Sequence, residues 1–182
     1  MQTNFKSPNN IAQKSVETHE SIPWNDLHLA TGNDSYSSLS APLYTISGLW
    51  MERFRIQTNQ IWATGYSFTP SGLAINGIEV RVNIKRNARI EDLLIQLTLN
   101  GELIGQNYAI IKTSQEAYWT NTEQPGDFHV YGGTLDMWGT TLSVSDINDP
   151  TFGVVLAYQS NETLPHRDIA YINQVAMRVN FE

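Results

Sequence analysis

The sequence contains no cysteine and few charged residues, and it has no long apolar run. Without cysteine, disulfide bonds and thiol catalysis are excluded, so the fold needs no oxidising compartment. Hydrophobic residues make up 41% and charged residues 16% of the 182 positions, which is typical of a folded domain rather than a disordered chain. Because no apolar run approaches the roughly 20 residues that a membrane-spanning helix needs, we expect no membrane insertion.

Positive charge is also scarce. Acidic residues outnumber basic residues by 18 to 11, and the formal net charge is -7. This balance disfavours nucleic acid as a partner, because the phosphate backbone attracts proteins with clustered Lys and Arg. The N-terminal residues lack the apolar segment of a secretory signal, so we expect the protein to stay in the cytosol or to be released by lysis.

The clearest secondary-structure signal lies in residues 74–85, where apolar and polar residues alternate. The apolar set is Ile78, Val80, Val82 and Ile84, and the polar set is Glu79, Arg81, Asn83 and Lys85. A period of two places the apolar side chains on one face of a strand and the polar ones on the other. This pattern predicts a strand of an antiparallel sheet, with one dry face and one face in water.

Further apolar stretches, separated by Gly, Pro and Asn, predict more strands. They are residues 52–68, Leu93–Leu99, Tyr108–Ile111, Phe152–Tyr158 and Ile169–Phe181. Asn100-Gly101 between two such stretches predicts a type I′ hairpin turn, and Ser145 is expected to cap one helical turn over residues 145–148. About seven to ten short strands predict an all-β fold, an antiparallel β-sandwich of jelly-roll type over residues 23–182.

Residues 1–22 are mostly polar and predict an extended N-terminal arm. Such a segment cannot form a core alone and is ordered only when other contacts hold it. It could lie against a neighbouring subunit or another protein, or it could pack across its own domain. In the first case the candidate partner-binding residues are Phe5, Ile11, Val16, Ile22 and Trp24.

Candidate chemical sites are few. The four histidines are scattered and no G-x-S-x-G pattern occurs, so we expect no metal, no cofactor and no nucleophilic enzyme. A glycan-degrading enzyme would need two carboxylates in a cleft, for which Asp127 and Asp136 are the candidates. Exposed aromatic rings can stack on sugars. The candidate glycan-binding residues are Tyr118, Trp119, Phe128 and Tyr131, whereas Trp138 is expected to fill one end of the core.

Several blocks of the chain together resemble a domain that recurs in structural proteins of tailed bacteriophages. The blocks are Gly65–Phe68 with Ile75–Val80, then Tyr131–Gly139, and then Asp146–Val154. The resemblance implies a β-sandwich without enzymatic activity in a tail, neck, fibre or capsid-decoration part. It also implies other virion proteins as partners, a virion location after assembly in the host cytoplasm, and a homo-oligomer such as a trimer. The rival expectation is a carbohydrate-binding module that recognises a host-surface glycan.

Overall fold

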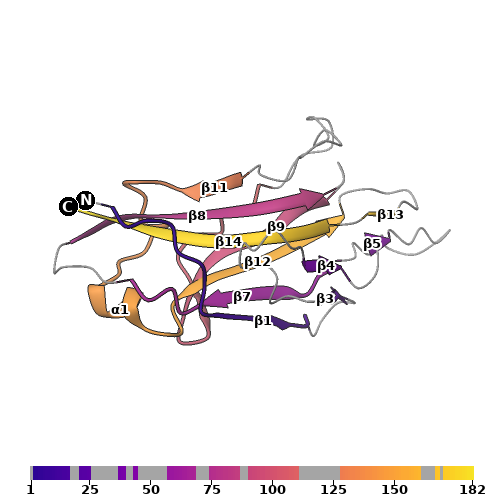
Figure 1. The fold of residues 1–182 in the computed structure, drawn as a ribbon, viewed down its shortest axis with the longest axis horizontal. Coiled ribbons are helices and arrows are strands. Elements are labelled where there is room, and N and C mark those ends of the chain that lie inside the picture. The colour runs from indigo at the N-terminus through magenta and orange to yellow at the C-terminus, as the bar shows by residue number, and fades with distance from the viewer. Residues whose placement is uncertain are drawn as a thin grey trace.

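The computed structural model describes most of the chain. The described residues are 2–16, 21–25, 37–39, 43–44, 57–68, 74–86, 90–110, 128–160, 167–168 and 170–182. Almost all regular structure in them is β-strand, as the sequence predicts, with one short helix, α1 (Val144–Asn148). The strands lie in two large sheets and one two-stranded sheet (Figure 1).

The first large sheet has five strands in the order β11-β8-β14-β4-β3. They are β3 (Trp24–Asn25), β4 (Ser37–Leu39), β8 (Ile75–Arg86), β11 (Phe128–Gly132) and β14 (Ala170–Phe181). The long strands β8 and β14 pair antiparallel along nearly their whole length, with two register shifts, one between Ile172 and Gln174 and one between Asn180 and Phe181. β11 extends the sheet on the other side of β8.

The second large sheet has seven strands and contains the path β1-β7-β12-β6-β2, while β9 pairs with both β12 and β10. They are β1 (Asn10–Lys14), β2 (Ser21–Ile22), β6 (Gln57–Thr58), β7 (Gln60–Thr64), β9 (Ile90–Leu99), β10 (Glu102–Ile104) and β12 (Gly153–Ser160). The two-stranded sheet joins β5 (Leu43–Tyr44) to β13 (Arg167–Asp168). β2 and β6 run parallel, which corrects the expectation of purely antiparallel pairing.

The buried core takes side chains from both large sheets. Ile78, Val80, Val82 and Ile84 of β8 are all buried, so the dry face is confirmed. The expected wet face is wrong in part, because Glu79 and Asn83 are buried as well. Glu79 accepts hydrogen bonds from the β14 side chains of Arg178 and Asn180, which local alternation cannot predict.

The hairpin turn is confirmed. Leu99 pairs with Glu102, and both residues between them have positive φ, 55° at Asn100 and 81° at Gly101. This is the backbone that a type I′ turn requires.

Two other local predictions are wrong. The helix cap is Ser143 rather than Ser145, because Ser143 forms a capping box with Asp146. Tyr108–Ile110 lies outside the strands, although the Tyr108 N–H donates to Ile95 O at 2.8 Å.

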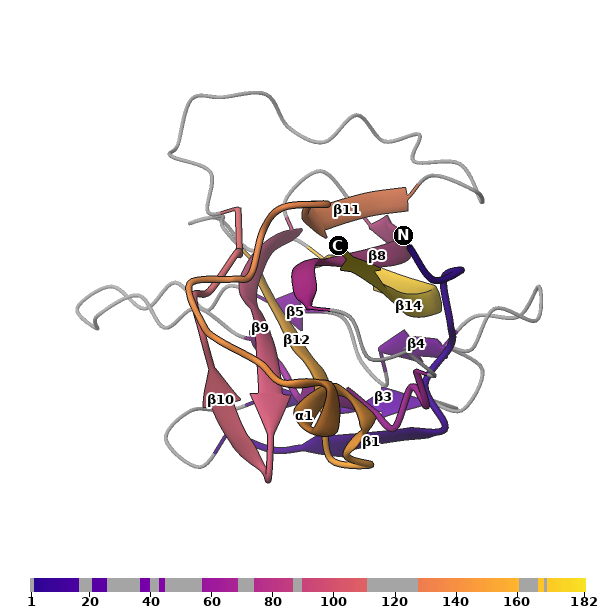
Figure 2. The same cartoon turned by 90° about the vertical axis from the view of Figure 1, so that its left-hand side faces the viewer.

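The N-terminal segment, residues 2–14, contacts both large sheets in turn. Backbone hydrogen bonds join Thr3 to Val179 and Lys6 to Met177 of β14, and β1 then pairs with β7. Figure 2 shows this segment passing from beside β14 to β1 along one side of the molecule. The described part of the predicted arm therefore packs across its own domain, the second of the two alternatives. β1 of this segment belongs to the same sheet as β12.

Candidate functional site

Two candidate sites emerge, one on the outer face of the five-stranded sheet and one at the end of the molecule that holds α1 and the C-terminus. The first, here called the Arg81 patch, consists of Phe5, Arg81, Phe128, Val130 and the ion pair between Glu79 and Arg178. Val130 lies directly opposite Arg81 in the pairing of β11 with β8. Phe128 and Val130 are 40% and 54% exposed, so apolar surface lies beside the charged groups.

Phe5 and Phe128 both stack on the Arg81 guanidinium. Arg81 Cζ lies 4.2 Å from the centre of the Phe5 ring and 4.5 Å from the centre of the Phe128 ring. Arg178 also lies over Phe5, at 4.6 Å. The sequence predicts Phe5 as a partner-binding residue of the N-terminal arm and Phe128 as a glycan-binding residue. The structure brings the two residues together at one site.

Glu79, which is paired with Arg178, supplies the negative charge among the described residues of the patch. Arg178 donates to both carboxylate oxygens of Glu79, with Nη2···Oε1 at 2.9 Å, and Asn180 Nδ2 donates to Oε2 at 3.0 Å. These hydrogen bonds, those from Arg178 above all, hold the pKa of Glu79 below its usual range. The hydrogen bond from Arg178 to Glu79 raises the pKa of Arg178.

The other predicted partner-binding residues do not form a common surface. Ile11 on β1 and Ile22 on β2 are half-buried and pack against the core. Val16 is half-buried, and its N–H donates to Ser21 Oγ at 3.4 Å. Trp24 is only 3% exposed and its indole N–H donates to Asn59 O, so a partner could not reach its ring in this structure. Its assignment as a partner-binding residue is corrected.

The predicted glycan-binding residues separate in the same way. Tyr118 and Trp119 lie outside the described residues, as does Asp127. Tyr131 is 3% exposed, and its hydroxyl donates to Asp92 Oδ2 at 3.0 Å, so it is a core residue and not a sugar platform. Phe128 and Tyr131 are three positions apart on one strand and therefore point to opposite faces. The odd spacing of the two residues on a strand is the sequence signal that separates them.

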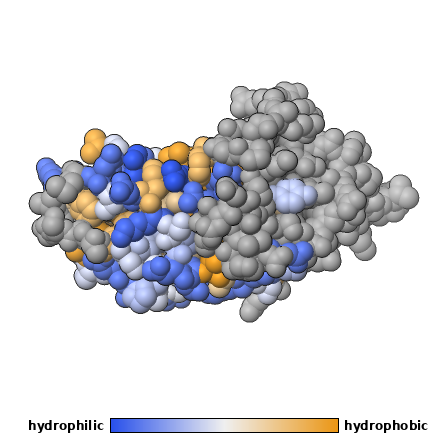
Figure 3. All heavy atoms as spheres, in the orientation of Figure 1, coloured by the Kyte–Doolittle hydropathy of each residue, from blue (hydrophilic) through white to orange (hydrophobic). Residues whose placement is uncertain are grey.

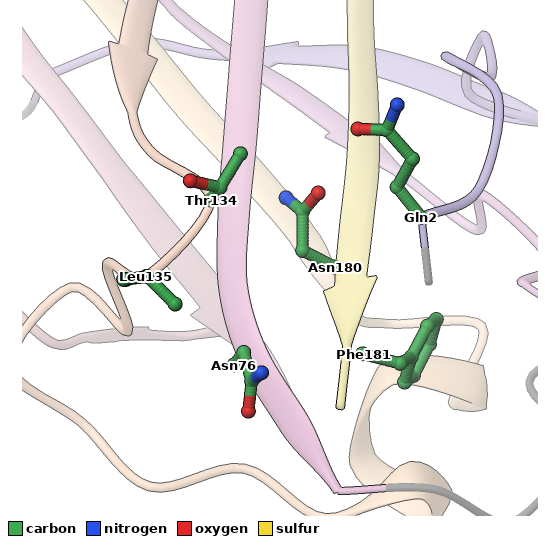
Figure 4. Close-up of a pocket in the computed structure, with 6 residues that line it drawn as sticks. All are labelled: Gln2, Asn76, Thr134, Leu135, Asn180 and Phe181. Atoms are coloured by element: carbon green, nitrogen blue, oxygen red, sulfur yellow. The ribbon is translucent and has the colours of Figure 1, made fainter.

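The second candidate site is a pocket of about 350 Å³ at the end of the molecule (Figure 4). Its lining residues come from four parts of the chain: the N-terminal segment, β8, β14, and the loop that follows β11. They are Gln2, Asn76, Thr134, Leu135, Asn180 and Phe181. None of these side chains carries a formal charge. Leu135 is 82% exposed beside the pocket, whereas Asn180 is buried and held by Glu79.

Trp138 is buried near this end of the molecule. Hydrogen bonds here and at Phe152 join the segments that resemble the phage domain in two pairs. The buried indole N–H of Trp138 donates to Ile78 O at 2.9 Å, and Gly133 N donates to the same oxygen at 3.2 Å. These bonds join the block Tyr131–Gly139 to Ile75–Val80. Gly65 N donates to Phe152 O at 3.0 Å, which joins Gly65–Phe68 to Asp146–Val154. The expectation that Trp138 is a core residue is confirmed.

Asp136, one of the candidate catalytic carboxylates, has a structural role beside Trp138. It accepts hydrogen bonds from the Trp138 backbone N–H at 2.8 Å and from the Tyr108 hydroxyl at 2.7 and 2.8 Å. The hydrogen bond to Asp136 raises the pKa of Tyr108 to about 12.

Within the described ranges, no group of three or more His, Cys, Asp or Glu side chains could hold a metal ion. The part of the chain that the structure describes contains no helix long and apolar enough to cross a membrane.

Comparison of the chain with family models, with curated proteins and with solved structures finds no match.

Proposed function

We propose that this chain is a non-enzymatic structural component of a tailed-bacteriophage particle, in a tail, neck, fibre or capsid-decoration part. The observation that carries the proposal is the pairing of the resemblance blocks. Segments that are far apart in the sequence meet through Trp138 and Phe152, so the residues that carry the resemblance form one connected structural unit. The proposal includes a jelly-roll-like β-sandwich, supported by a core drawn from both large sheets.

The proposed protein-binding surface is the Arg81 patch. Arg and aromatic residues are enriched among the residues that dominate binding energy at protein interfaces. The patch combines one arginine between two phenylalanine rings with the exposed side chains of Phe128 and Val130. Figure 3 shows apolar side chains among polar ones on this face of the molecule, including its upper edge. Figure 1, which has the same orientation, shows β11 near that edge. We propose other virion proteins, including further copies of this chain in a homo-oligomer, as the partners.

The test is co-sedimentation with phage particles. A tagged copy supplied in infected host cells should sediment with purified particles at a constant ratio and should be labelled on them by an antibody. A chain that stays in the soluble fraction at the top of the gradient would overturn the proposal.

A pair of variants tests the surface. Phe128→Ser should reduce incorporation, because it removes an exposed ring of the Arg81 patch. Leu135→Ser is the matched control, since Leu135 is even more exposed but lies at the other site. Equal incorporation of the two variants would exclude the patch as the docking surface.

A carbohydrate-binding module is the second candidate function, and the pocket of Figure 4 favours it. Amide and hydroxyl groups from Gln2, Asn76 and Thr134 line a pocket of about 350 Å³, within the usual size range for small ligands. Uncharged hydrogen-bonding groups next to apolar Leu135 suit a neutral sugar. A glycan array should then show a signal that Asn76→Ala removes and that Asn10→Ala, a change of an exposed asparagine on β1, preserves. No signal on any neutral glycan would exclude this function.

A further inference from the structure

Arg81 is held in place by three different parts of the chain. It lies on β8, Phe5 of the N-terminal segment covers one side of its guanidinium, and Phe128 of β11 covers another. Contacts of this kind with aromatic rings favour a cation and restrict its side-chain rotation. Because the rings stack on the guanidinium, hydrogen bonding is left to the N–H groups at its edge.

These N–H groups are nearly unused. A guanidinium has five N–H donors. Arg81 Nη2 lies 3.4 Å from Gln174 Oε1, which is a long and weak contact, and Arg81 Nε is buried with no hydrogen-bond partner. An arginine with a buried, unsatisfied donor carries a desolvation cost that the rings only partly offset.

Among the residues that the structure describes, Arg81 has no ion-pair partner. Glu79 is bound by Arg178 and Asn180, so its carboxylate oxygens are already occupied. Burial lowers the pKa of Arg81, and the neighbouring charge of Arg178 lowers it further. In the described part of this face, two guanidinium groups therefore lie beside one carboxylate, which Arg178 binds, although the whole chain carries a net charge of -7. The described residues of the patch therefore carry one positive charge in excess.

The terminal N–H groups of Arg81, which are not buried as Nε is, match a carboxylate. Hydrogen bonds between a guanidinium and a carboxylate are among the stronger ones in proteins, because both partners are charged and the geometry is bidentate. The net negative charge of the chain disfavours polyanions such as nucleic acid. The exposed side chains of Phe128 and Val130 offer apolar contacts beside the cation, and an acidic side chain flanked by apolar residues fits both features.

We propose that Arg81 is the carboxylate anchor of a protein-docking surface and binds an Asp or Glu side chain in an extended segment of a partner protein. Phe5 and Phe128 orient the guanidinium, and Val130 contacts an apolar residue next to the acidic one. The inference deepens the proposed function, and its biological role rests on that function. The chemistry of Arg81 can nevertheless be tested on the isolated chain.

The probe is a blocked peptide, Gly-Val-Glu-Val-Gly, titrated at low ionic strength into the full-length chain labelled with nitrogen-15. The readout is the Nε–Hε signal of Arg81, assigned by its loss in Arg81→Lys. We expect this signal to shift in a saturable way with the Glu peptide. The isosteric peptide Gly-Val-Gln-Val-Gly should bind at least about tenfold more weakly, because it lacks the charge.

Variants separate a specific anchor from general charge attraction. Arg81→Gln should weaken Glu-peptide binding at least about tenfold, as followed by the signals of β11 and β8. Arg81→Lys keeps the charge but loses the planar donor pair, so it should weaken binding several-fold. Lys14→Gln is the matched control, since it removes the same charge from another cation that lies over an aromatic ring, 3.5 Å from the centre of Trp62. It should bind like the wild type.

Each contrary result overturns the proposal. These results are the absence of a shift with the Glu peptide, wild-type binding by Arg81→Gln, and an equal loss in Lys14→Gln. An oligogalacturonate arm tests an acidic glycan instead, and tighter binding of that sugar at Arg81 would also overturn the assignment to a protein partner. Because the particle test uses infected cells and this test uses the isolated chain, failure of one is distinguishable from failure of the other.

Discussion

Replacing Trp138 by Ala should destabilise the domain strongly. The side chain is fully buried, its ring centre lies 4.4 Å from that of Tyr108, and its N–H binds Ile78 O. Removing a buried Phe or Trp side chain costs about 3–5 kcal/mol, because transfer energy is lost and a cavity remains. For a chain of this size, 1 kcal/mol changes the melting temperature by roughly 2–4 °C, so we expect a decrease of about 6–20 °C.

Trp138→Phe separates ring packing from the hydrogen bond. Phe keeps most of the ring but loses the N–H. Ile78 O then still accepts the Gly133 N–H, so the carbonyl is not left without a partner. The loss should therefore be near the net value of one hydrogen bond, about 0.5–1.5 kcal/mol, with a small addition for the lost ring volume.

The stability losses of Trp138→Ala and Trp138→Phe are measured by chemical and thermal unfolding. Unfolding is followed by far-UV circular dichroism, which reports on the backbone rather than on tryptophan fluorescence. Leu135→Ala is the control in the same loop, and because Leu135 is 82% exposed its effect should stay within about 0.5 kcal/mol. A loss below about 2 kcal/mol for Trp138→Ala would refute the structural role of this residue. An equal loss for the Ala and Phe variants would show that the N–H, and not the packing, dominates.

Three further predictions follow from the described contacts. Deleting residues 2–8 should lower the urea midpoint, because the backbone bonds to β14 are lost, and an unchanged midpoint would show that this part of the segment is dispensable. The Tyr108 pKa is raised from 10.0 to about 12, so its contribution to stability is complete below pH 10 and is lost as the pH rises through 12; Tyr108→Phe should lack this decrease in an alkaline melting series. Gly77→Ala should cost about 1–3 kcal/mol in urea unfolding, because its Cβ would lie 2.4 Å from Gly133 O, whereas Gly133→Ala has room and should cost less.

Local sequence patterns predicted the parts of the fold that depend on neighbouring residues. Alternation in residues 74–85 predicted which side chains of β8 enter the core, because side chains on a strand must alternate between faces. Asn100-Gly101 predicted its turn, because few residues accept positive φ. The N-terminal segment shows the limit of such patterns. Its polar composition indicated that other contacts must hold it, but composition could not identify them.

The candidate site depended on contacts between distant segments. Arg81 is one of several polar residues on β8, and its sequence neighbours do not distinguish it. Its position between Phe5 and Phe128 depends on the packing of the N-terminal segment against the sheet and on the register of β11 against β8. The Glu79–Arg178 pair likewise depends on the register of β14. A shift of one residue would turn these side chains to the other face.

The sequence by itself determined that the chain forms strands, where the Asn-Gly turn lies, and which apolar side chains of β8 enter the core, because backbone sterics and side-chain periodicity act over a few residues. Only the tertiary structure decided that the N-terminal segment joins the two large sheets and that Phe5 and Phe128 meet at Arg81. Those contacts link residues that are far apart in the chain. They form only when strand register and sheet packing bring them together, so no local pattern can encode them.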